Sequence, residues 1–448
     1  MFRLGLPTLV GAGAGLTILV IACTRLNPAY CDVDTQDCSC DLSTHSCRPT
    51  DGGSDGVGMQ CTQDGQCNPP HCVQNHCVAC TPASAATDCP MGQICSAQNQ
   101  CASCEADADC DAAYAGGAAC LGGGCVAASQ VAFVDCDPGA GTCGTRTGSR
   151  AAPYCTLQEG VDASRPQVVM TKRSCSYGSI QIQNHTVTIW GRGAILQISA
   201  STDGIGVHGS TSNVTVHDLE VTGAASPNAG NGVLVDTGAS ARLVHVNVHN
   251  LPVQDGVQAN RASRLELSRS LVMGAYLWGV EVVDTPRFDL ENSYLLGNGN
   301  TSVSSGGGAR FSGAQTGMSE SKFVYNTIAR NVGAPGTGVQ CETATVMLTN
   351  CLVPNDGITF MPPYTCVIAG GTVGPTTPAR VPSLIFVNFD QPQSTWTKCQ
   401  GLHVDPAKPV AMTDVVHRGV FQDQPTVDFD GDPRPMMPTP GADEPICP

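Results

Sequence analysis

Basic residues are scarce in this sequence. The 448 residues include 22 Lys and Arg, only four of them Lys, against 38 Asp and Glu, for a formal net charge of −16. Proteins that bind a phosphate backbone neutralise it with clustered Lys and Arg, and this composition offers no such patch. It therefore argues against nucleic acid as a partner, and we interpret the acidity as a solubility feature of an exposed surface.

Cysteine is missing from a long central stretch and crowded into an early one. Of the 26 Cys, 18 lie in residues 31–143 and none lies between Cys175 and Cys341. Residues 31–143 also contain almost no run of Val, Ile, Leu or Phe that could form a core. A chain of this length is expected to fold as more than one unit. The distribution predicts an early unit held by covalent bonds and a later one held by packing.

The early cysteines are expected to form disulfide bonds. Such bonds belong to exported proteins and stabilise small domains that have little core. Structural zinc is the alternative, because Cys77-x2-Cys80 and Cys101-x2-Cys104 resemble zinc knuckles. We predict disulfides and, with them, export.

The N-terminus has the features of a secretory signal. Arg3 precedes an apolar run, rich in Gly and Ala, over residues 4–22. The run ends in Val20-Ile21-Ala22-Cys23, which resembles the bacterial lipobox. The resemblance implies that residues 1–22 are a lipoprotein signal peptide and that Cys23 carries a lipid. Thr24, in place of Asp, implies the outer membrane or cell surface as the destination.

An uncleaved membrane anchor is the alternative to lipidation, since 19 apolar residues could just span a bilayer. Gly11, Gly13 and Gly15 weaken such a helix, so we predict a lipid anchor. A lipid on Cys23 leaves 25 cysteines, an odd number. One thiol is therefore expected to be free or to form an intermolecular disulfide.

Sixteen cysteines form four groups of four, which predict small repeated modules. The groups are Cys31, Cys38, Cys40, Cys47; Cys61, Cys67, Cys72, Cys77; Cys80, Cys89, Cys95, Cys101; and Cys104, Cys110, Cys120, Cys125. Modules this short depend on bridges rather than on a core. The pattern resembles the Cys-rich spacers of lipoproteins from myxobacteria and related soil bacteria. We predict that residues 23–130 form a loop-dominated stalk, with a receptor-like binding module as the alternative.

From residue 179 onward, short β-branched runs are separated by Gly, Asn and Asp. One segment recurs at spacings of 28, 24, 23, 29 and 30 residues. Its copies are Gly204-Ile-Gly-Val, Gly232-Val-Leu-Val, Gly256-Val-Gln-Ala, Gly279-Val-Glu-Val, Gly308-Ala-Arg-Phe and Gly338-Val-Gln-Cys. A repeat of this length with three short strands fits one coil of a parallel β-helix.

Stacking the six segments gives columns of similar chemistry. The first and third positions after the Gly are predicted to point inward: Ile205, Val233, Val257, Val280, Ala309, Val339 and Val207, Val235, Ala259, Val282, Phe311, Cys341. The second position is predicted to point outward: Gly206, Leu234, Gln258, Glu281, Arg310, Gln340. This alternation is the period of two that a strand requires.

A second strand follows in each coil: Val214-Thr-Val, Leu243-Val-His, Leu265-Glu-Leu, Phe288-Asp-Leu, Ser321-Lys-Phe and Val346-Met-Leu. Two residues beyond it come Asp218, Asn247, Arg269, Asn292, Tyr325 and Asn350. Three Asn and one Asp among these six predict a partial polar ladder at a tight bend.

These repeats resemble the right-handed parallel β-helix superfamily typified by pectate lyases and the PbH1 repeat, over about residues 151–360. The resemblance implies a mainly β solenoid, which we place at residues 131–375. Residues 152–161 resemble the helix that caps such solenoids, since a solenoid end exposes unpaired backbone.

Residues 376–448 are expected to form an irregular C-terminal cap, tied by Cys399 and Cys447. The run Asp428-x-Asp430-x-Asp432 could ligate calcium. It lacks the Glu at the twelfth position that an EF-hand loop needs, so we predict a turn.

Polysaccharide lyases on this fold need carboxylates on one outer face to hold Ca²⁺ and a Lys or Arg as base. The outward column beyond the first strand reads His208, Asp236, Asn260, Val283, Ser312, Glu342. Asp236 and Glu342 are four coils apart, about 19 Å at roughly 4.8 Å per coil. No acidic cage is expected, and Asp236 stays a weak catalytic candidate.

A glycoside hydrolase needs two carboxylates within about 10 Å of each other. Asp255, Glu281 and Asp284 lie in neighbouring coils and are the best such cluster, with Arg261 and Arg264 close in sequence. Four histidines suggest a metal only weakly, because they fall in different columns: His208, His217, His245 and His249.

The fold does not determine the function, since β-helices serve as enzymes, adhesins and surface filaments. Our first hypothesis is a non-enzymatic, surface-anchored lipoprotein that binds polysaccharide along the helix face, without a cofactor. The alternative is a polysaccharide lyase or glycoside hydrolase acting on acidic polysaccharide, with calcium in the lyase case.

Overall fold

The computed structural model describes residues 38–41, 46–49, 71–73, 76–81, 84–90, 92–113, 118–137, 146–171, 175–198, 201–223, 228–302, 306–313, 321–333, 338–343, 345–353, 358–360, 366–369, 372, 425–435 and 438–442. The predicted lipidation site Cys23, together with Cys399 and Cys447, lies outside this range. No helix in the described part of the chain is long and apolar enough to cross a membrane. The chain divides into two compact units, residues 1–114 with 122–125, and residues 115–121 with 126–448.

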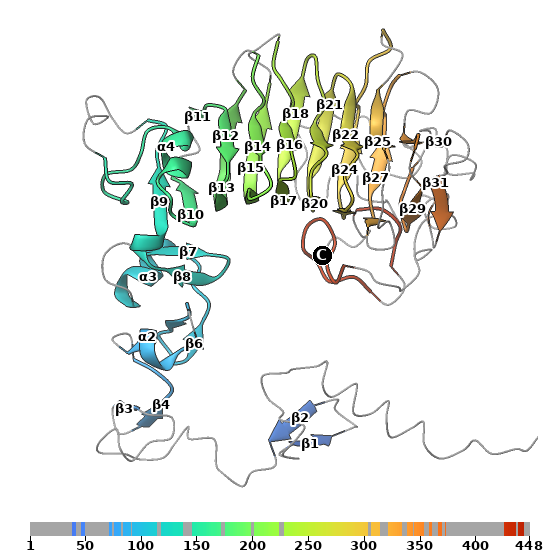
Figure 1. Cartoon of the computed structure of the whole chain (residues 1–448). Coiled ribbons are helices and arrows are strands. Elements are labelled where there is room, and N and C mark those ends of the chain that lie inside the picture. The colour runs from blue at the N-terminus through green and yellow to red at the C-terminus, as the bar shows by residue number, and fades with distance from the viewer. Residues whose placement is uncertain are drawn as a thin grey trace, which may run out of the picture. The chain divides into compact units, whose positions relative to one another are not determined.

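The first unit consists of short hairpins and helical turns (Figure 1). Its elements are β1 (Cys38–Asp41), β2 (Ser46–Pro49), β3 (His71–Val73), β4 (His76–Val78), α2 (Ala85–Asp88), β5 (Ile94–Cys95), β6 (Cys101–Ala102) and α3 (Asp107–Ala113). The strands pair antiparallel as β1–β2, β3–β4 and β5–β6. Each element is too short to bury a core of its own.

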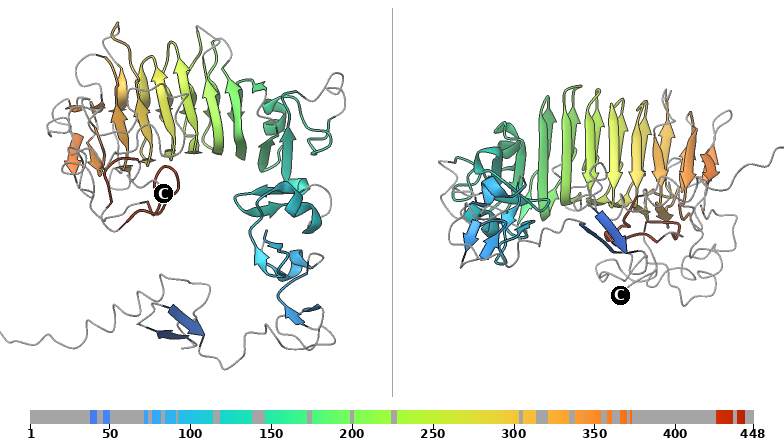
Figure 2. Two further views of the ribbon diagram at one scale, coloured as in Figure 1. Left: turned by 180° about the vertical axis from the view of Figure 1, so that it is seen from behind. Right: turned by 90° about the horizontal axis from the view of Figure 1, so that it is seen from below.

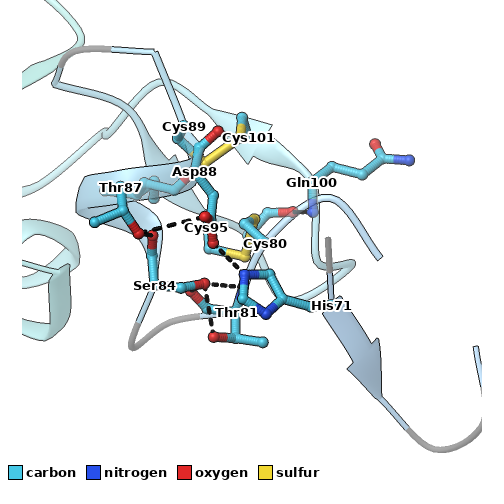
Figure 3. The surroundings of a disulfide bond; sticks show 12 residues. His71, Cys80, Thr81, Ser84, Thr87, Asp88, Cys89, Cys95, Gln100 and Cys101 are labelled. Carbon is cyan, nitrogen blue, oxygen red and sulfur yellow. Dashed lines mark hydrogen bonds and ion pairs between the residues drawn. A yellow bond between two sulfur atoms is a disulfide. The ribbon is translucent and has the colours of Figure 1, made fainter. Parts of the chain in front are cut away.

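Disulfides hold this unit together, as predicted. In the third group of cysteines, Cys80 pairs with Cys95 and Cys89 pairs with Cys101 (Figure 3). The fourth group repeats the pairing of its second and fourth members, Cys110 with Cys125. The zinc alternative is wrong here, because Cys80, Cys101 and Cys104 are all disulfide-bonded.

One ionic contact joins the β3–β4 hairpin to the disulfide module. Figure 3 shows the His71 imidazole against the carboxylate of Asp88 at the end of α2. Hydrogen bonds from Ser84 and His71 hold the pKa of Asp88 below its usual value. Bridges and local polar contacts therefore replace hydrophobic burial in this unit.

The second unit is a parallel β-solenoid, which confirms the predicted mainly β fold. Its first sheet is the eight-stranded stack β12 (Ile180–Gln183), β14 (Ile205–His208), β16 (Val233–Asp236), β19 (Val257–Asn260), β22 (Trp278–Val283), β25 (Gly307–Ser312), β28 (Val339–Cys341) and β30 (Ile358–Phe360). The predicted copies occupy six of these strands, from β14 to β28. Figure 2 shows successive coils stacked side by side.

A second sheet forms the rest of the coil wall in two rows. The long strands β13 (Thr186–Gln197) and β15 (Asn213–Thr222) cross both rows. The second row continues with β17 (Ser240–Val244), β20 (Arg264–Ser268), β23 (Phe288–Glu291), β26 (Lys322–Val324), β29 (Val346–Thr349) and β31 (Cys366–Ala369). The third row continues with β18 (Asn247–Leu251), β21 (Leu271–Ala275), β24 (Tyr294–Leu296) and β27 (Thr327–Ala329).

The register of the first sheet is the predicted one. Val233 pairs with Val257, and Val257 pairs with Val280. All twelve side chains predicted to point inward are at most 1 % exposed. The glycines at or just before the start of β14, β16, β19 and β22 are required because the next coil approaches closely: a Cβ on Gly232, for example, would lie 2.5 Å from the carbonyl oxygen of Gly256.

The second strand of one coil is shifted from the predicted register. Ala241, not Leu243, pairs with Val214, so Leu243 is the second inward residue. The bend residue of that coil is therefore His245, and the assignment of Asn247 to this position was wrong. Ala241 is small, so the sequence did not mark it as an inward position. All seven bend residues are left-handed, with φ between +48° and +57°: Arg192, Asp218, His245, Arg269, Asn292, Tyr325 and Asn350. We call them the corner row.

The polar ladder exists one residue later than predicted and points inward. The Ser270 hydroxyl accepts from the Val246 backbone N–H at 3.1 Å, and Ser293 accepts from Ser270 N–H at 3.2 Å. Asn326 Oδ1 accepts from Ser293 N–H at 3.0 Å. Each side chain satisfies a buried donor of the preceding coil.

The N-terminal end of the solenoid is closed by strands and a helix. β9 (Val131–Val134), β10 (Gln167–Met170) and β11 (Ser176–Tyr177) extend the second sheet. The expected capping helix is α4 (Leu157–Asp162), which begins at Thr156 with a capping box to Glu159 and buries Leu157 and Val161.

Disulfides stand at both ends of the solenoid and not in its middle. Cys136 pairs with Cys175, and Cys341 pairs with Cys366. Among the described cysteines Cys351 is free, and burial raises the pKa of its thiol to about 12. The intermolecular disulfide remains a prediction and would need a cysteine outside the described residues.

Residues 425–435 form a hairpin, with Val427 bridged to Pro433. The predicted turn is its tip, where Asp428 Oδ1 accepts from the backbone N–H of Asp432 at 2.9 Å. This hairpin lies along the side of the solenoid, where polar groups of the corner row bind it: Arg269 Nε donates to the Phe429 carbonyl at 3.0 Å. Residues 376–424 of the predicted C-terminal cap lie outside the described residues.

Candidate functional site

The predicted carboxylate pair on the first sheet does come together. Asp255, just before β19, and Glu281 of β22 share a donor, because Gln258 Nε2 lies 3.4 Å from Asp255 Oδ2 and 2.5 Å from Glu281 Oε2. The two residues are 2 % and 6 % exposed. Burial, reinforced by the charge of Glu281, raises the pKa of Asp255 to about 7. A carboxyl group that titrates near neutrality is typical of general acids, so this pair is one candidate centre.

Arg310 is the basic partner of this pair. Its two terminal nitrogens lie 2.6 Å from Glu281 Oε1 and 2.6 Å from Glu342 Oε2. Gln258 also donates to Glu281, at 2.5 Å. Every carboxylate of the network is thus bound by the protein's own donors.

The structure does not bring Arg261 or Arg264 into the network, where they were predicted to supply the base. Arg261 follows β19 with φ at +52°. Arg264 lies beyond that turn, in β20 of the second row, where it binds Glu266 and Asp289 at 2.7 Å. Arg261 and Arg264 are close to Asp255 in sequence, but the chain bends between Asn260 and β20. This bend carries Arg264 away from the first sheet.

Asp255 also has a structural role. Its Oδ1 accepts from the backbone N–H of Trp278 in the next coil at 2.7 Å. Asn231 accepts from Asp255 N–H in the same way, and Asp203 accepts from Asn231 N–H. Asp255 is thus one member of an axial ladder that satisfies buried donors. This ladder and the burial of both acids oppose a catalytic interpretation of the pair.

The remaining carboxylate candidates are apart from this pair. Asp236 accepts a hydrogen bond from Nδ1 of His208, 2.8 Å away. Asp284 is exposed with φ at +48°. Within the described residues, the groups close enough to hold a metal consist of disulfide cysteines, one of them with Asp135.

A pocket of about 550 Å³ opens instead beside the corner row. It lies between that row and the first residues of the third row. The lining comprises Arg192, Gly193, Asp218, Leu219, Glu220, His245, Val246, Asn247, Arg269, Leu271 and Phe429. We call it the side pocket. Its size is that of ordinary small-molecule sites.

Each of the two carboxylates that line the side pocket contacts a histidine. His245 Nδ1 lies 2.6 Å from Asp218 Oδ1, and His249 Nε2 lies 2.9 Å from Glu220 Oε1. The hydrogen bond from His245 lowers the pKa of Asp218. Asn247 differs from these groups, since its Oδ1 is buried without a hydrogen-bond partner.

Sequence reasoning missed the side pocket almost entirely. Asn247 was misplaced by the register shift, and His245 was assigned no role. Arg269 was considered only as an interruption of the ladder. Phe429 comes from a segment 160 residues further along the chain. The one signal in the sequence was the non-Gly residue at each bend, which projects a side chain outward where a glycine would not.

Comparisons with known proteins add a likeness of fold. No protein family profile matches the sequence, and no curated protein matches it. A solved structure described as the crystal structure of pectate lyase Pel9A aligns with 70 % of this chain and 96 % of its own, at 14 % identity and a TM-score of 0.42. We draw no conclusion about activity from that similarity.

Proposed function

We propose that this chain is a non-enzymatic surface protein that holds a glycan in the side pocket. The proposal includes the sequence-based expectation of a lipid on Cys23 and a location at the outer membrane or cell surface. The side pocket carries the proposal: it combines guanidinium, carboxylate and amide groups with the ring of Phe429. Such a mixture of planar polar groups and one aromatic wall suits a ligand rich in hydroxyl groups.

Binding without catalysis is favoured by the state of the acids. Glycosidases need one carboxyl of raised pKa as general acid beside a second carboxylate. In the side pocket, His245 lowers the pKa of Asp218, which makes it a poor proton donor. The other carboxylate of the lining, Glu220, lies 2.9 Å from His249 Nε2, so a histidine engages each acid of the pocket.

A hydrolase centred on Asp255 and Glu281 is the second candidate. The observation that favours it is the pKa of about 7 at Asp255. It requires substrate to reach two acids that are almost fully buried. A polysaccharide lyase would in addition need carboxylates gathered around Ca²⁺.

The anchor is tested with Cys23→Ser. The variant is expected to lose labelling by radioactive fatty acid and to leave the membrane fraction, since the lipid is the only anchor that the proposal includes. A variant that stays in the membrane would instead support an uncleaved apolar helix.

The released Cys23→Ser protein then serves to test binding and activity. We expect binding to members of a glycan array and no rise in unsaturated-uronide absorbance on pectate, alginate or chondroitin, with or without calcium. A calcium-dependent signal lost in Asp236→Ala would establish the lyase. Release of reducing sugar that disappears in Glu281→Gln would establish the hydrolase. An array without any bound glycan would refute the proposed binding function.

A further inference from the structure

The side pocket lies beside the first part of the corner row, and the chain's own C-terminal residues bind the rest of that row. Beyond the pocket, the corner row holds the C-terminal hairpin and the residues after it. Asn292 Nδ2 donates to the Val427 carbonyl at 2.6 Å, and Arg434 donates back to Asn292 Oδ1 at 2.8 Å. The Arg434 guanidinium also lies over the ring of Tyr325, 4.1 Å from its centre.

The contacts continue to the far end of the corner row. Gly441 N–H donates to the carbonyl of Asn350 at 2.8 Å, and Ala442 N–H donates to Thr327 Oγ1 at 2.9 Å. The bend residues from Arg269 to Asn350 therefore bind the chain's own polar groups. Arg192, Asp218 and His245 stand in the same row, but this open part of the row borders the side pocket.

Phe429, at the tip of the hairpin, separates the filled part from the open part. Its ring packs edge-on against Tyr294, with centroids 4.8 Å apart, and against His245 at 6.3 Å. Its carbonyl is held by Arg269. A ligand that enters along the corner row therefore meets an aromatic wall at the hairpin.

Asn247 supplies an independent sign of a ligand in the open part. Its Oδ1 is buried and accepts no hydrogen bond within the described chain. An unsatisfied buried acceptor costs about 1–3 kcal/mol, which a ligand donor can recover once the amide turns its oxygen towards the pocket that Asn247 lines. The next coil has Leu271 at the same register position, so the strand itself does not require a polar residue there.

We propose that the side pocket binds the end of an oligosaccharide chain, with Asn247 Oδ1 accepting from a sugar hydroxyl and Phe429 blocking the chain from continuing. The inference rests on the proposed function and specifies its ligand as a chain end rather than a chain interior. The C-terminal hairpin is then part of the binding site.

Two variants of the Cys23→Ser protein test the site. Asn247→Leu removes the acceptor and copies Leu271, so it should weaken binding tenfold or more without lowering thermal stability. Phe429→Ala removes the wall and should weaken binding to a similar extent. Arg242→Ala is the matched control, because Arg242 is 58 % exposed in the second row, outside the pocket. The probes are mannotriose, galactotriose, cellotriose and trigalacturonate, measured by isothermal titration calorimetry.

The number of protein molecules on each polymer tests chain-end recognition. Analytical ultracentrifugation with the polymer of the best trisaccharide should give at most two proteins per chain, and many more for Phe429→Ala if it still binds. Many proteins per chain for the parent would overturn chain-end binding. Glycan binding that is unchanged by Asn247→Leu and Phe429→Ala would overturn the side pocket as the binding site, and with it chain-end recognition there, while glycan binding by the protein would stand. Failure of all probes and of the array would remove both.

Discussion

The two units of this chain reach stability by opposite means. In the first, the third group of cysteines places two bridges within residues 80–101. In the solenoid, the coils between Cys175 and Cys341 contain no cysteine at all. There the wall is built from stacked inward columns at most 1 % exposed. A short module gains stability from bridges that constrain its unfolded state, whereas a repeat gains it from burial against neighbouring coils.

The ends of the solenoid, like the first unit, are stabilised by disulfide bonds. An end coil has a neighbour on one side only, so it buries less apolar surface than a middle coil. Its two described disulfides, Cys136–Cys175 and Cys341–Cys366, are located at these ends. Covalent bonds therefore occur where packing is weakest in both units.

The largest expected effect comes from breaking the packing. Val257→Asp places an unpaired charge between Val233 and Val280, at a position that is 0 % exposed. Burying a lone charge costs several kcal/mol, more than most domains can tolerate. We expect the solenoid to lose its circular dichroism signal and Cys351 to become open to alkylation. A soluble variant with an unchanged spectrum and a protected Cys351 would show that the inward column is assigned wrongly.

The next largest loss of stability is expected when one disulfide bond of the first unit is removed. Replacing both Cys80 and Cys95 by Ser should destabilise the disulfide module by about 2–5 kcal/mol, the usual cost in small exported domains. Proteolysis is expected to cut within residues 80–101. Cys351 serves as the internal control, since its buried thiol should stay unlabelled while the solenoid is folded. We expect the two units to unfold separately. Labelling of Cys351 at the same time as cleavage within residues 80–101 would contradict this expectation.

The sequence predicted the parts of the fold that repeat. All six copies have a Gly where neighbouring coils come close and apolar residues at alternate positions. Aligning them therefore defines the register of the first sheet. The register of the second strand was misassigned in one coil. Ala241 is small, so the sequence did not distinguish the true inward pair, Ala241 and Leu243, from Leu243 and His245. The sequence of a single coil is too short to determine the register of its strands by itself.

The candidate site was only half predictable from the sequence. Asp255 and Glu281 could be brought together because one coil separates them in a known register. Their partner Arg310 lay in the outward column but was passed over for Arg261 and Arg264. The side pocket could not be found, since it depends on the docking of Phe429 against Arg269, 160 residues away in the sequence. Long-range docking leaves no periodic signal.

A third effect follows from the charge buried inside the solenoid. Asp255 has a pKa of about 7 in the folded protein against 3.8 as its ordinary value. Between pH 4 and 7 the folded state keeps a proton that the unfolded state has lost, so stability from this group falls as pH rises through that window. Asp255→Asn removes the titration and should add up to about 4 kcal/mol at pH 8.

Urea unfolding at pH 4 and at pH 8 measures this difference. The variant should match the parent at pH 4 and exceed it at pH 8. Asn231 already performs the same backbone contact one coil earlier, so the amide suits the position. A variant that is less stable at both values would show that the ionised carboxylate is needed. In that case the Asp255 and Glu281 pair regains interest as a reactive centre.

The smallest effect is expected at the outer corner of the same solenoid. The His245 imidazole bonds Asp218, and this hydrogen bond holds the pKa of Asp218 below 3.8. Both side chains are about half exposed, at 54 % and 44 %, so solvent screens the pair. Asp218→Asn keeps a residue that tolerates positive φ and should lower stability by less than about 1 kcal/mol near pH 6.

The pH dependence at Asp218 has the opposite sign to that of Asp255. A lowered pKa gives stability that is present above the unfolded value of 3.8 and is lost as pH falls through the folded value. Asp218→Asn should therefore converge with the parent as pH drops towards 2, whereas Asp255→Asn diverges from it as pH rises. If Asp218→Asn lowered stability as much as removal of the Cys80–Cys95 disulfide, exposed polar pairs, and not burial alone, would hold the coils together.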